Sequence, residues 1–278
     1  MGRTASNRDW TEVGAGCWVR RYPEWDVNVG VLAGSGGVLV VDTRGTAAQG
    51  RLLRDDIRRL DARPVRWVVN THQHFDHVFG NIAFDDAQIH AHENAAAGID
   101  AAADRVKALC RAEDPDDPLN RAVIDTPLRH PDTTFSAARS LDIGDRRVEL
   151  SYPGRGHTDG DILIRVPDAD VVFAGDLVEE SAPPAFGPDS FPIDWPLALG
   201  QVVGVVGAGT TVVPGHGVPV DRAFVQEQRR DVGALAATIT DLFRSGVPID
   251  EALAHGEWPW ESALLVDAVR RGYGQLGV

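Results

Sequence analysis

The sequence contains very little cysteine: Cys17 and Cys110 are the only 2 cysteines among 278 residues. So few cysteines exclude a disulfide framework, and two buried thiols in a reducing compartment are expected instead. The sequence also has no apolar run that is long enough to cross a membrane. The first residues, Met1 to Ser6, are polar and lack the apolar core of a signal peptide. These absences predict a soluble, cytoplasmic protein.

Positive charge is the second shortage. The chain has 27 Lys and Arg against 41 Asp and Glu, a formal net charge of −14, and Lys107 is its only lysine. Affinity for nucleic acid comes largely from Lys and Arg that neutralise phosphates, and anionic membranes attract basic surfaces for the same reason. We therefore expect neither of these partners and favour a small-molecule substrate.

One stretch, residues 70–77, is rich in metal-binding side chains. It reads Asn-Thr-His-Gln-His-Phe-Asp-His and follows an apolar run that is typical of a buried strand. An extended backbone would point His72, His74 and Asp76 in one direction, because alternate side chains share a face. His77 joins them only if a helix begins near Asp76, and Asp favours helix starts.

These four side chains suit two metal ions. Neutral imidazoles favour zinc, and a carboxylate adds charge compensation for a second dication. A surface loop that is rich in histidine by chance is the alternative interpretation. Ordered ligand spacing directly after a strand makes the metal site the stronger hypothesis.

The pattern His-x-His-x-Asp-His after a strand resembles the signature of the metallo-β-lactamase superfamily. Three later segments resemble the remaining motifs of that family, in the expected order: residues 156–161, 173–176 and 213–217. The resemblance covers most of the chain and is specific for the superfamily, not for a substrate. It implies a four-layer αβ/βα sandwich of two mixed β-sheets, with helices outside and the metals at one edge.

The resemblance also implies the roles of individual residues. Three imidazoles would bind one divalent ion, and an Asp and two imidazoles would bind a second. Another Asp would bridge the two ions. Zinc is the default metal, and iron or manganese is also compatible with such ligands. Asp76 and Asp176 are expected to be catalytic as well as metal-binding. The expected ligands are His72, His74 and His157 for the first ion, Asp76, His77 and His216 for the second, and Asp176 as the bridge.

The order of elements supports this fold, because the same plan occurs twice. A hairpin is followed by a helix at residues 47–60 and a strand at 66–69 that leads into the first motif. In the second half, a helix at residues 195–206 and a strand at 210–213 lead into the last motif. The sequence therefore predicts two similar halves, each of which supplies ligands from the ends of its strands.

The remaining regions are expected to be structural. Residues 1–12 are interpreted as a loose lead-in and residues 114–118 as an acidic surface loop. The second His-x-His, at residues 90–92, has no third ligand at useful spacing. An apolar stripe in the helix expected at residues 222–243 indicates core packing, with a homo-oligomer contact as the alternative. We expect a single domain over residues 1–278, in which 246–278 form a C-terminal helical appendage.

The metal site predicts a hydrolase. A water shared by two dications becomes a hydroxide near neutral pH and attacks a polarised carbonyl. Asp176 resembles the bridging residue of glyoxalase II and lactonases, so an ester, lactone, thioester or amide substrate is expected. The basic residues that hold glutathione in glyoxalase II find no match here. The alternatives are an oxidoreductase like the mononuclear-iron persulfide dioxygenases, a β-lactamase, and a binding protein with a vestigial site.

The segment from Ser181 to Trp195 is expected to line the active site. Long irregular segments in compact domains usually have a function, and this one begins five residues after Asp176. Its aromatic residues Phe186, Phe191 and Trp195 predict an apolar pocket wall that favours uncharged acyl groups. The alternative is that these rings only fill the core.

Overall fold

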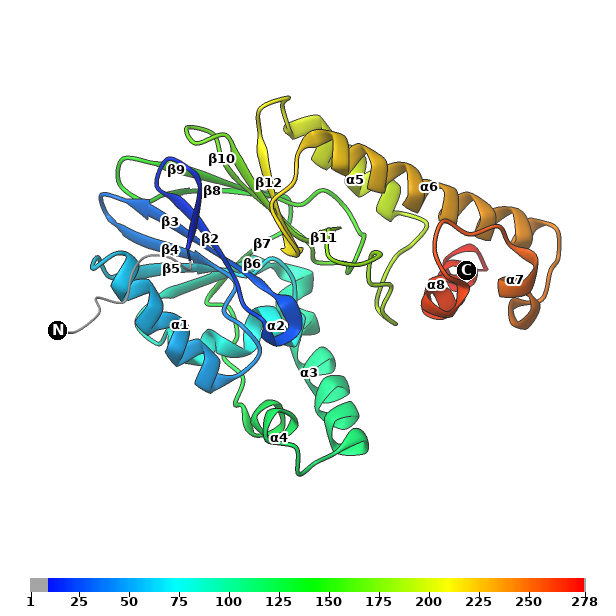
Figure 1. The fold of residues 1–278 in the computed structure, drawn as a ribbon, viewed down its shortest axis with the longest axis horizontal. Coiled ribbons are helices and arrows are strands. Elements are labelled where there is room, and N and C mark those ends of the chain that lie inside the picture. Colours follow the sequence, from blue (N-terminus) through cyan, green and yellow to red (C-terminus); the bar gives the residue numbers. More distant parts are fainter. Residues whose placement is uncertain (1–9, 278) are drawn as a thin grey trace.

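The computed structural model describes residues 10–277, which form two β-sheets packed face to face with helices on both outer sides (Figure 1). The first sheet has seven strands in sequence order: the first three neighbouring pairs are antiparallel and the last three are parallel. Its strands are β1 (Thr11–Gly14), β2 (Cys17–Arg21), β3 (Asn28–Gly34), β4 (Gly37–Val41), β5 (Val65–Val69), β6 (Gln88–His92) and β7 (Thr133–Phe135).

The second sheet has five strands in the order β12-β11-β10-β9-β8. Only β11 and β12 are parallel, and the other neighbours are antiparallel. Its strands are β8 (Ala138–Asp142), β9 (Arg147–Ser151), β10 (Leu163–Val166), β11 (Val171–Glu179) and β12 (Thr211–His216). Both sheets are mixed, which confirms the expected sandwich of two mixed sheets.

The layer between the sheets is apolar, and the period of two along each strand explains it. On β4, Leu39 and Val41 belong to the cluster between the two sheets, whereas Val38 and Val40 belong to the cluster under helix α1 (Ala47–Leu60). All four side chains are buried. A central strand covered on both faces therefore reads as a continuous apolar run, as β4 does.

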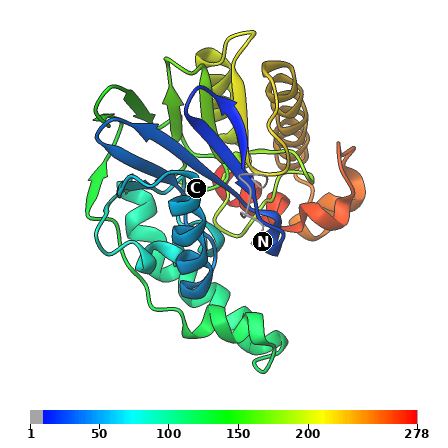
Figure 2. The ribbon, with the colours of Figure 1, turned by 60° about the vertical axis from the view of Figure 1, so that its left-hand side comes forward.

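Helices cover the outer faces of both sheets. In Figure 2, α1, α3 (Glu93–Glu113) and α4 (Pro118–Asp125) lie on one side, while α5 (Trp195–Val205) and α6 (Arg222–Arg244) lie on the other. Helix α1 begins at Ala47, as the sequence predicts, with the Thr46 side chain accepting a hydrogen bond from the Gln49 N–H. Three short helical elements complete this part of the chain: η2 (Glu24–Asp26), α2 (Phe75–Val78) and η3 (Phe79–Ala83).

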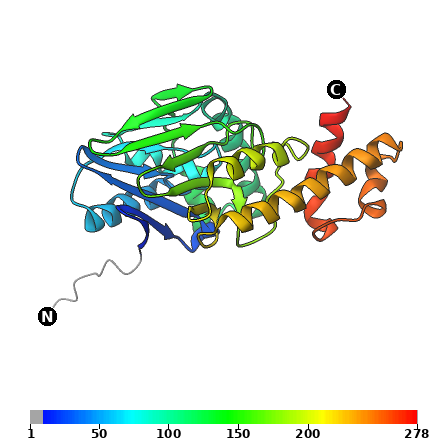
Figure 3. The same ribbon diagram turned by 90° about the horizontal axis from the view of Figure 1, so that it is seen from above.

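The C-terminal residues pack at the far end of α6, beyond the sheets (Figure 3). They form α7 (Ile249–His255), η4 (Ser262–Leu265) and α8 (Val266–Leu276). Ala252, Leu265 and Val269 lie in the same hydrophobic cluster as the buried faces of α5 and α6. The C-terminal helices are therefore joined to the second sheet by continuous apolar packing.

Several expectations differ from the structure. The segment 114–118 is not only a loop, because Pro118 begins α4 and the Asp117 side chain caps it. Strand β11 was expected to end at Ala174, but parallel pairing with β12 extends it to Glu179. Strands β1, β7 and β8 lie at or near sheet edges and were not expected. Most of the expected lead-in, residues 1–9, lies outside the described residues.

Cys17 and Cys110 are both buried and free, so the expectation of two unpaired thiols is confirmed. Among residues 10–277, none of the helices combines the length and the apolar character that a membrane crossing requires.

Candidate metal centre

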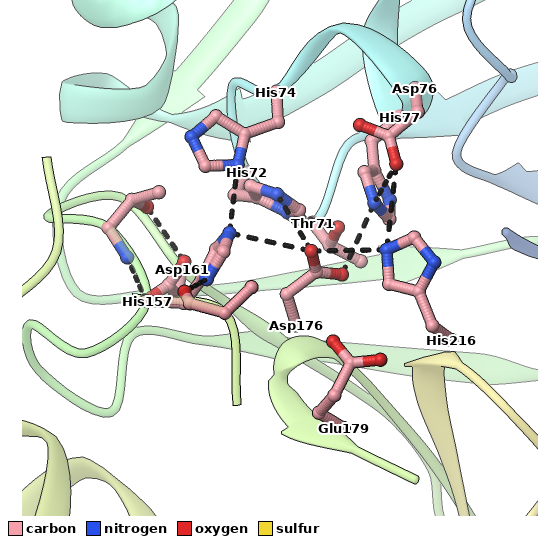
Figure 4. Close-up of polar contacts among 12 residues, drawn as sticks. Thr71, His72, His74, Asp76, His77, His157, Asp161, Asp176, Glu179 and His216 are labelled. Carbon is pink, nitrogen blue, oxygen red and sulfur yellow. Dashed lines mark hydrogen bonds and ion pairs between the residues drawn. The ribbon is translucent and has the colours of Figure 1, made fainter. Parts of the chain in front are cut away.

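The seven side chains expected to bind metal converge at one edge of the sandwich (Figure 4). The first four come from one short stretch: His72 and His74 lie in the turn after β5, and Asp76 and His77 lie in helix α2, which begins at Phe75. The other three come from the second half: His157 from the β9–β10 loop, Asp176 from within β11, and His216 from the end of β12. Strand pairing, not proximity along the chain, therefore assembles the centre.

The first group of ligand atoms contains three imidazoles and one carboxylate. His157 Nε2 lies 2.8 Å from His74 Nδ1 and 3.4 Å from Asp176 Oδ2. His72 Nε2 lies 3.6 Å from the same carboxylate oxygen. These four atoms surround a space in which one ion can contact all of them.

The second group lies on the other side of Asp176. His77 Nε2 is 3.4 Å from Asp76 Oδ2 and 3.2 Å from Asp176 Oδ1. His216 Nε2 is 3.5 Å from Asp76 Oδ2 and 3.3 Å from Asp176 Oδ2. Asp176 thus presents oxygens toward both groups, which is the geometry that a bridging carboxylate requires.

Each of the five imidazoles is oriented by a partner at its outer nitrogen. An outer N–H that donates to an oxygen leaves the lone pair of the inner nitrogen facing the centre. The tautomers therefore follow from the partners. These contacts are His72 Nδ1 to Thr71 Oγ1 (3.0 Å), His74 Nε2 to Asp189 Oδ2 (3.1 Å), His77 Nδ1 to Asp42 Oδ2 (2.8 Å), His157 Nδ1 to the Ala185 carbonyl (3.0 Å) and His216 Nδ1 to the Trp25 carbonyl (2.9 Å).

The inner atoms fit a metal ion. His72 Nε2, His77 Nε2 and Asp176 Oδ1 are buried and have no hydrogen-bond partner among the described residues. Buried polar atoms are nearly always paired, so such a convergent set needs a different partner. Imidazole nitrogens and carboxylate oxygens are ligands that zinc, iron and manganese all accept.

Charges around the two groups support the same interpretation. Burial lowers the pKa of His157 to about 4 and holds the pKa of His72 well below its usual value, so both rings are neutral ligands. At His216 burial also opposes the charge, but Asp176 and Asp76 outweigh it and raise the pKa to about 10. The carboxylates that favour a proton there also favour a dication.

A cavity of about 290 Å³ reaches Glu179 but none of the seven candidate ligands, and it is strongly acidic. It is lined by the four carboxylates of Glu179, Glu180, Glu227 and Asp231, together with the aromatic rings of Phe224 and Trp260. All the lining residues belong to the described part of the chain, and Lys and Arg do not occur among them. An anionic ligand would be repelled from this cavity.

Comparison with known proteins identifies the family. The family model of the metallo-beta-lactamase superfamily matches residues 22–231. The chain belongs to that superfamily. Membership, together with the His and Asp cluster, supports a metal-dependent hydrolase that acts on a small molecule.

Proteins similar to this chain carry different activities in their names. The chain is 25% identical over 197 residues to a type 2 metallo-beta-lactamase of Bacillus cereus, covering 70% of this chain and 68% of the relative. It is 28% identical over 235 residues to the 2,4-dinitroanisole O-demethylase subunit alpha of Nocardioides sp., covering 81% of this chain and 65% of the relative. A solved metallo-beta-lactamase from Pontibacter korlensis shares the fold, with a TM-score of 0.64, 21% identity, and coverage of 81% of this chain and 98% of that one.

Polar residues outside the superfamily motifs support the ligands, and the sequence did not predict them. Asp42, which follows β4, is 2% exposed and has a φ of 63°. Its carboxylate accepts hydrogen bonds from the Thr71 N–H and hydroxyl, both at 2.8 Å, and from His77. Asp189 similarly joins His74 to Arg105, at 2.6 Å from Nη2. An Asp directly after a buried strand was the one signal available for Asp42.

Two further features shape the site around Asp176. Glu179, also missed from sequence, is 6% exposed and places a carboxylate oxygen within 4.8 Å of the ligand atoms of Asp176 and His216. A Cβ at Gly215 would lie 1.8 Å from Asp176 Oδ1. Only glycine at that position lets β12 approach the carboxylate so closely.

The three aromatic residues of segment 181–195 do not form one wall. Trp195 is fully buried and stands behind His157, with ring centroids 5.7 Å apart. Phe186 is 6% exposed and packs on Trp195 at 5.0 Å. Phe191 lies half-buried between the guanidinium groups of Arg155 and Arg271. Trp195 and Phe186 therefore support the centre from behind.

Helix α8 holds this segment in place. The Arg271 side chain donates to the Ser190 carbonyl at 2.8 Å. Gln275 accepts from the Ile193 N–H and donates to Asp194 Oδ2, both at 3.1 Å. The same segment supplies the contacts to the outer nitrogens of His74 and His157, so α8 is linked to the metal centre through it.

Proposed function

We propose that the protein is a hydrolase with two divalent ions, zinc by default, that cleaves a carboxylic ester, lactone, thioester or amide. The observation that carries the proposal is the orientation of all five imidazoles, whose inner nitrogens face Asp76 and Asp176. When bound, the ions supply an acidified water and polarise the substrate carbonyl. The cytoplasm is the proposed location.

The two aspartates have distinct proposed roles. Asp176 compensates charge for both ions, because one of its oxygens lies near each ligand group. Asp76 compensates charge at the second ion and accepts a hydrogen bond from the attacking water, which orients it toward the carbonyl. Asp76 lies in the first turn of α2, and Asp176 lies within β11 against Gly215. Both carboxylates are carried by regular structure, so little reorganisation is needed during the reaction.

The acidic cavity favours neutral substrates. Four carboxylates line it beside two aromatic rings, and the net charge of the chain is −14. Phosphodiesters and other polyanions would meet repulsion as they approach this acidic surface beside Glu179. We therefore propose that uncharged acyl groups are turned over faster than phosphodiesters carrying the same aryl leaving group.

The proposal is tested by metal analysis and turnover of a panel of aryl esters, thioesters and lactones by the zinc- and manganese-loaded protein. Asp176→Ala should retain close to one ion per chain instead of two, because each ion loses a ligand and their repulsion grows. Its turnover should fall at least about a hundredfold. His90→Leu, at a buried site outside the centre, is the control and should retain both ions. Two tightly bound ions and normal turnover in Asp176→Ala would refute the bridging role.

A second candidate is hydrolysis of an activated aryl methyl ether. It is favoured by the 28% identity to the 2,4-dinitroanisole O-demethylase subunit alpha over 81% of this chain. Water and 2,4-dinitroanisole would give 2,4-dinitrophenol and methanol, so the coloured phenol reports the reaction directly. A β-lactam in the panel tests the lactamase alternative. Oxygen uptake with a persulfide tests the dioxygenase alternative.

A further inference from the structure

We propose that Glu179 is an additional ligand of the second ion and biases that position toward manganese or ferrous iron over zinc. The inference rests on the proposed two-ion site. It concerns a residue that lies outside all four motifs by which the superfamily was recognised.

Strand register places Glu179 beside the centre. In the parallel pair of β11 and β12, Glu179 is the partner of His216, after an irregularity in the register that follows Gly175. Its carboxylate, the Asp176 carboxylate and the His216 imidazole each offer a ligand atom within 4.8 Å of the others. Figure 4 shows the Glu179 carboxylate below Asp176 and directed toward the centre. Two ligands of one ion lie at most about 4.4 Å apart at ordinary bond lengths, so small shifts complete the contact.

Glu179 lacks the neutralising partner that a buried carboxylate needs. It is 6% exposed, and its side chain accepts one hydrogen bond, from the Ser181 hydroxyl at 3.3 Å. Within residues 10–277, the ion pairs of Lys and Arg do not include Glu179. A buried carboxylate is costly unless it is paired or coordinates a metal, and the space beside His216 is where a cation would pair with it.

The backbone at Glu179 is fixed from outside the sheet. Gln228, a buried residue of α6, accepts a hydrogen bond from the Glu179 N–H at 3.0 Å. Its amide group donates to the Leu177 carbonyl at 2.8 Å. Helix α6 therefore fixes the backbone of β11 at both Leu177 and Glu179. The backbone that carries the Glu179 carboxylate is held in place before any ion binds.

With Glu179 included, the two positions differ in ligand chemistry. The first offers three imidazole nitrogens and one carboxylate oxygen, which suits four-coordinate zinc. The second draws on two groups that share His216: Asp76, His77 and His216, and Asp176, Glu179 and His216. One ion between these groups would take two imidazole nitrogens and three carboxylate oxygens. More oxygen ligands and a higher coordination number favour manganese or ferrous iron. The third carboxylate also lowers the charge left by two dications from about +2 to about +1.

The experiment compares wild type, Glu179→Gln and Glu227→Gln. Each variant replaces one carboxyl group of the same cavity by an amide, but Glu227 is exposed and lies outside the ligand groups. Metal-free protein is reloaded with zinc, manganese or an equimolar mixture, and bound metals are counted by elemental analysis. Manganese affinity is measured by electron paramagnetic resonance of the free ion.

Wild type in the mixture should hold one zinc and one manganese per chain. Glu179→Gln should bind manganese at least about tenfold more weakly and take up zinc in its place, while Glu227→Gln should match wild type. Equal manganese affinity in wild type and Glu179→Gln overturns the inference. A wild type that never holds two ions refutes the two-ion proposal itself, so the two failures differ.

A second measurement does not depend on the folding of a variant. Crystals of wild type loaded with both metals, measured at the absorption edges of manganese and zinc, locate each ion separately. A Glu179 oxygen within about 2.5 Å of the manganese supports the inference. Zinc at the second position, or a Glu179 oxygen more than about 3 Å from the ion, overturns it.

Discussion

Replacement of Asp42 tests whether the centre is built before metal binds. Its carboxylate accepts three hydrogen bonds, all from buried groups: the Thr71 N–H, the Thr71 hydroxyl and His77 Nδ1, each at 2.8 Å. In Asp42→Ala the hydroxyl can rotate to another acceptor, but the two N–H groups cannot. An unsatisfied buried donor costs about 1–3 kcal/mol, so the loss of an acceptor for two N–H groups should cost the metal-free protein about 2–6 kcal/mol of unfolding free energy.

Asp42→Asn separates shape from charge. Asn tolerates the positive φ of 63° at this position, and its size is almost unchanged. Either orientation of the amide, however, sets its NH₂ group against a donor, at Thr71 or at His77. We expect a smaller loss of stability than in Asp42→Ala, but a comparable loss of affinity at the second ion, about 10–100-fold, because His77 no longer has a carboxylate to fix its tautomer.

Both quantities are measured on the same preparations. Urea unfolding of the metal-free proteins gives the stability change without linkage to bound metal. Competition with a chromophoric chelator then gives the affinity for the second ion. If both variants unfold like wild type and bind metal with wild-type affinity, Asp42 has no part in organising the centre and the argument from buried hydrogen bonds fails.

Two other substitutions test residues on either side of the centre. Asp189→Ala should weaken the affinity for the first ion about 10–100-fold in the same chelator assay, because His74 Nε2 loses its acceptor. Arg105→Ala should have a smaller effect, because Arg105 hydrogen-bonds to Asp189 and not to His74. Burial, followed by the charge of Arg139, lowers the pKa of His90 to about 4 in the folded protein. In the unfolded chain His90 has its usual pKa of about 6.5, so it is protonated there first as the pH falls. Stability is therefore lost as pH falls from about 6.5 toward 4. His90→Leu should remove that component, so its melting temperature should fall less than that of wild type between pH 7 and pH 4.5, and an equal fall would contradict the assignment.

The convergence of the candidate ligands could be predicted from sequence because they lie in short motifs. Residues 72–77 carry four of them within one turn, and their order after a strand limits what the backbone can do with them. The start of α1 could also be predicted, because Thr46 precedes an amphipathic stretch. Both features depend on local geometry, which a sequence pattern records directly.

Glu179 and Asp189 could not be found in this way. Glu179 lies beside the centre because β11 continues to pair with β12 past Gly175, and no local sequence pattern predicts that extension. Asp189 meets His74, 115 residues away, only when the two halves of the sandwich close. The start of α4 is a different case, because Asp117 before Pro118 is a readable capping pattern. The acidic composition of residues 114–117 obscured it.

Helix α8 lies beyond residue 231, where the match to the superfamily ends, yet it holds the segment that contacts the outer nitrogens of His74 and His157. Homologues can therefore inherit every ligand and still diverge in activity through changes in their last thirty or so residues. A chimera that exchanges only the C-terminal helices between two such proteins would transfer this influence without altering a single motif. For libraries aimed at new substrates, Arg271 and Gln275 are direct targets, because both contact the segment that lies against His74 and His157.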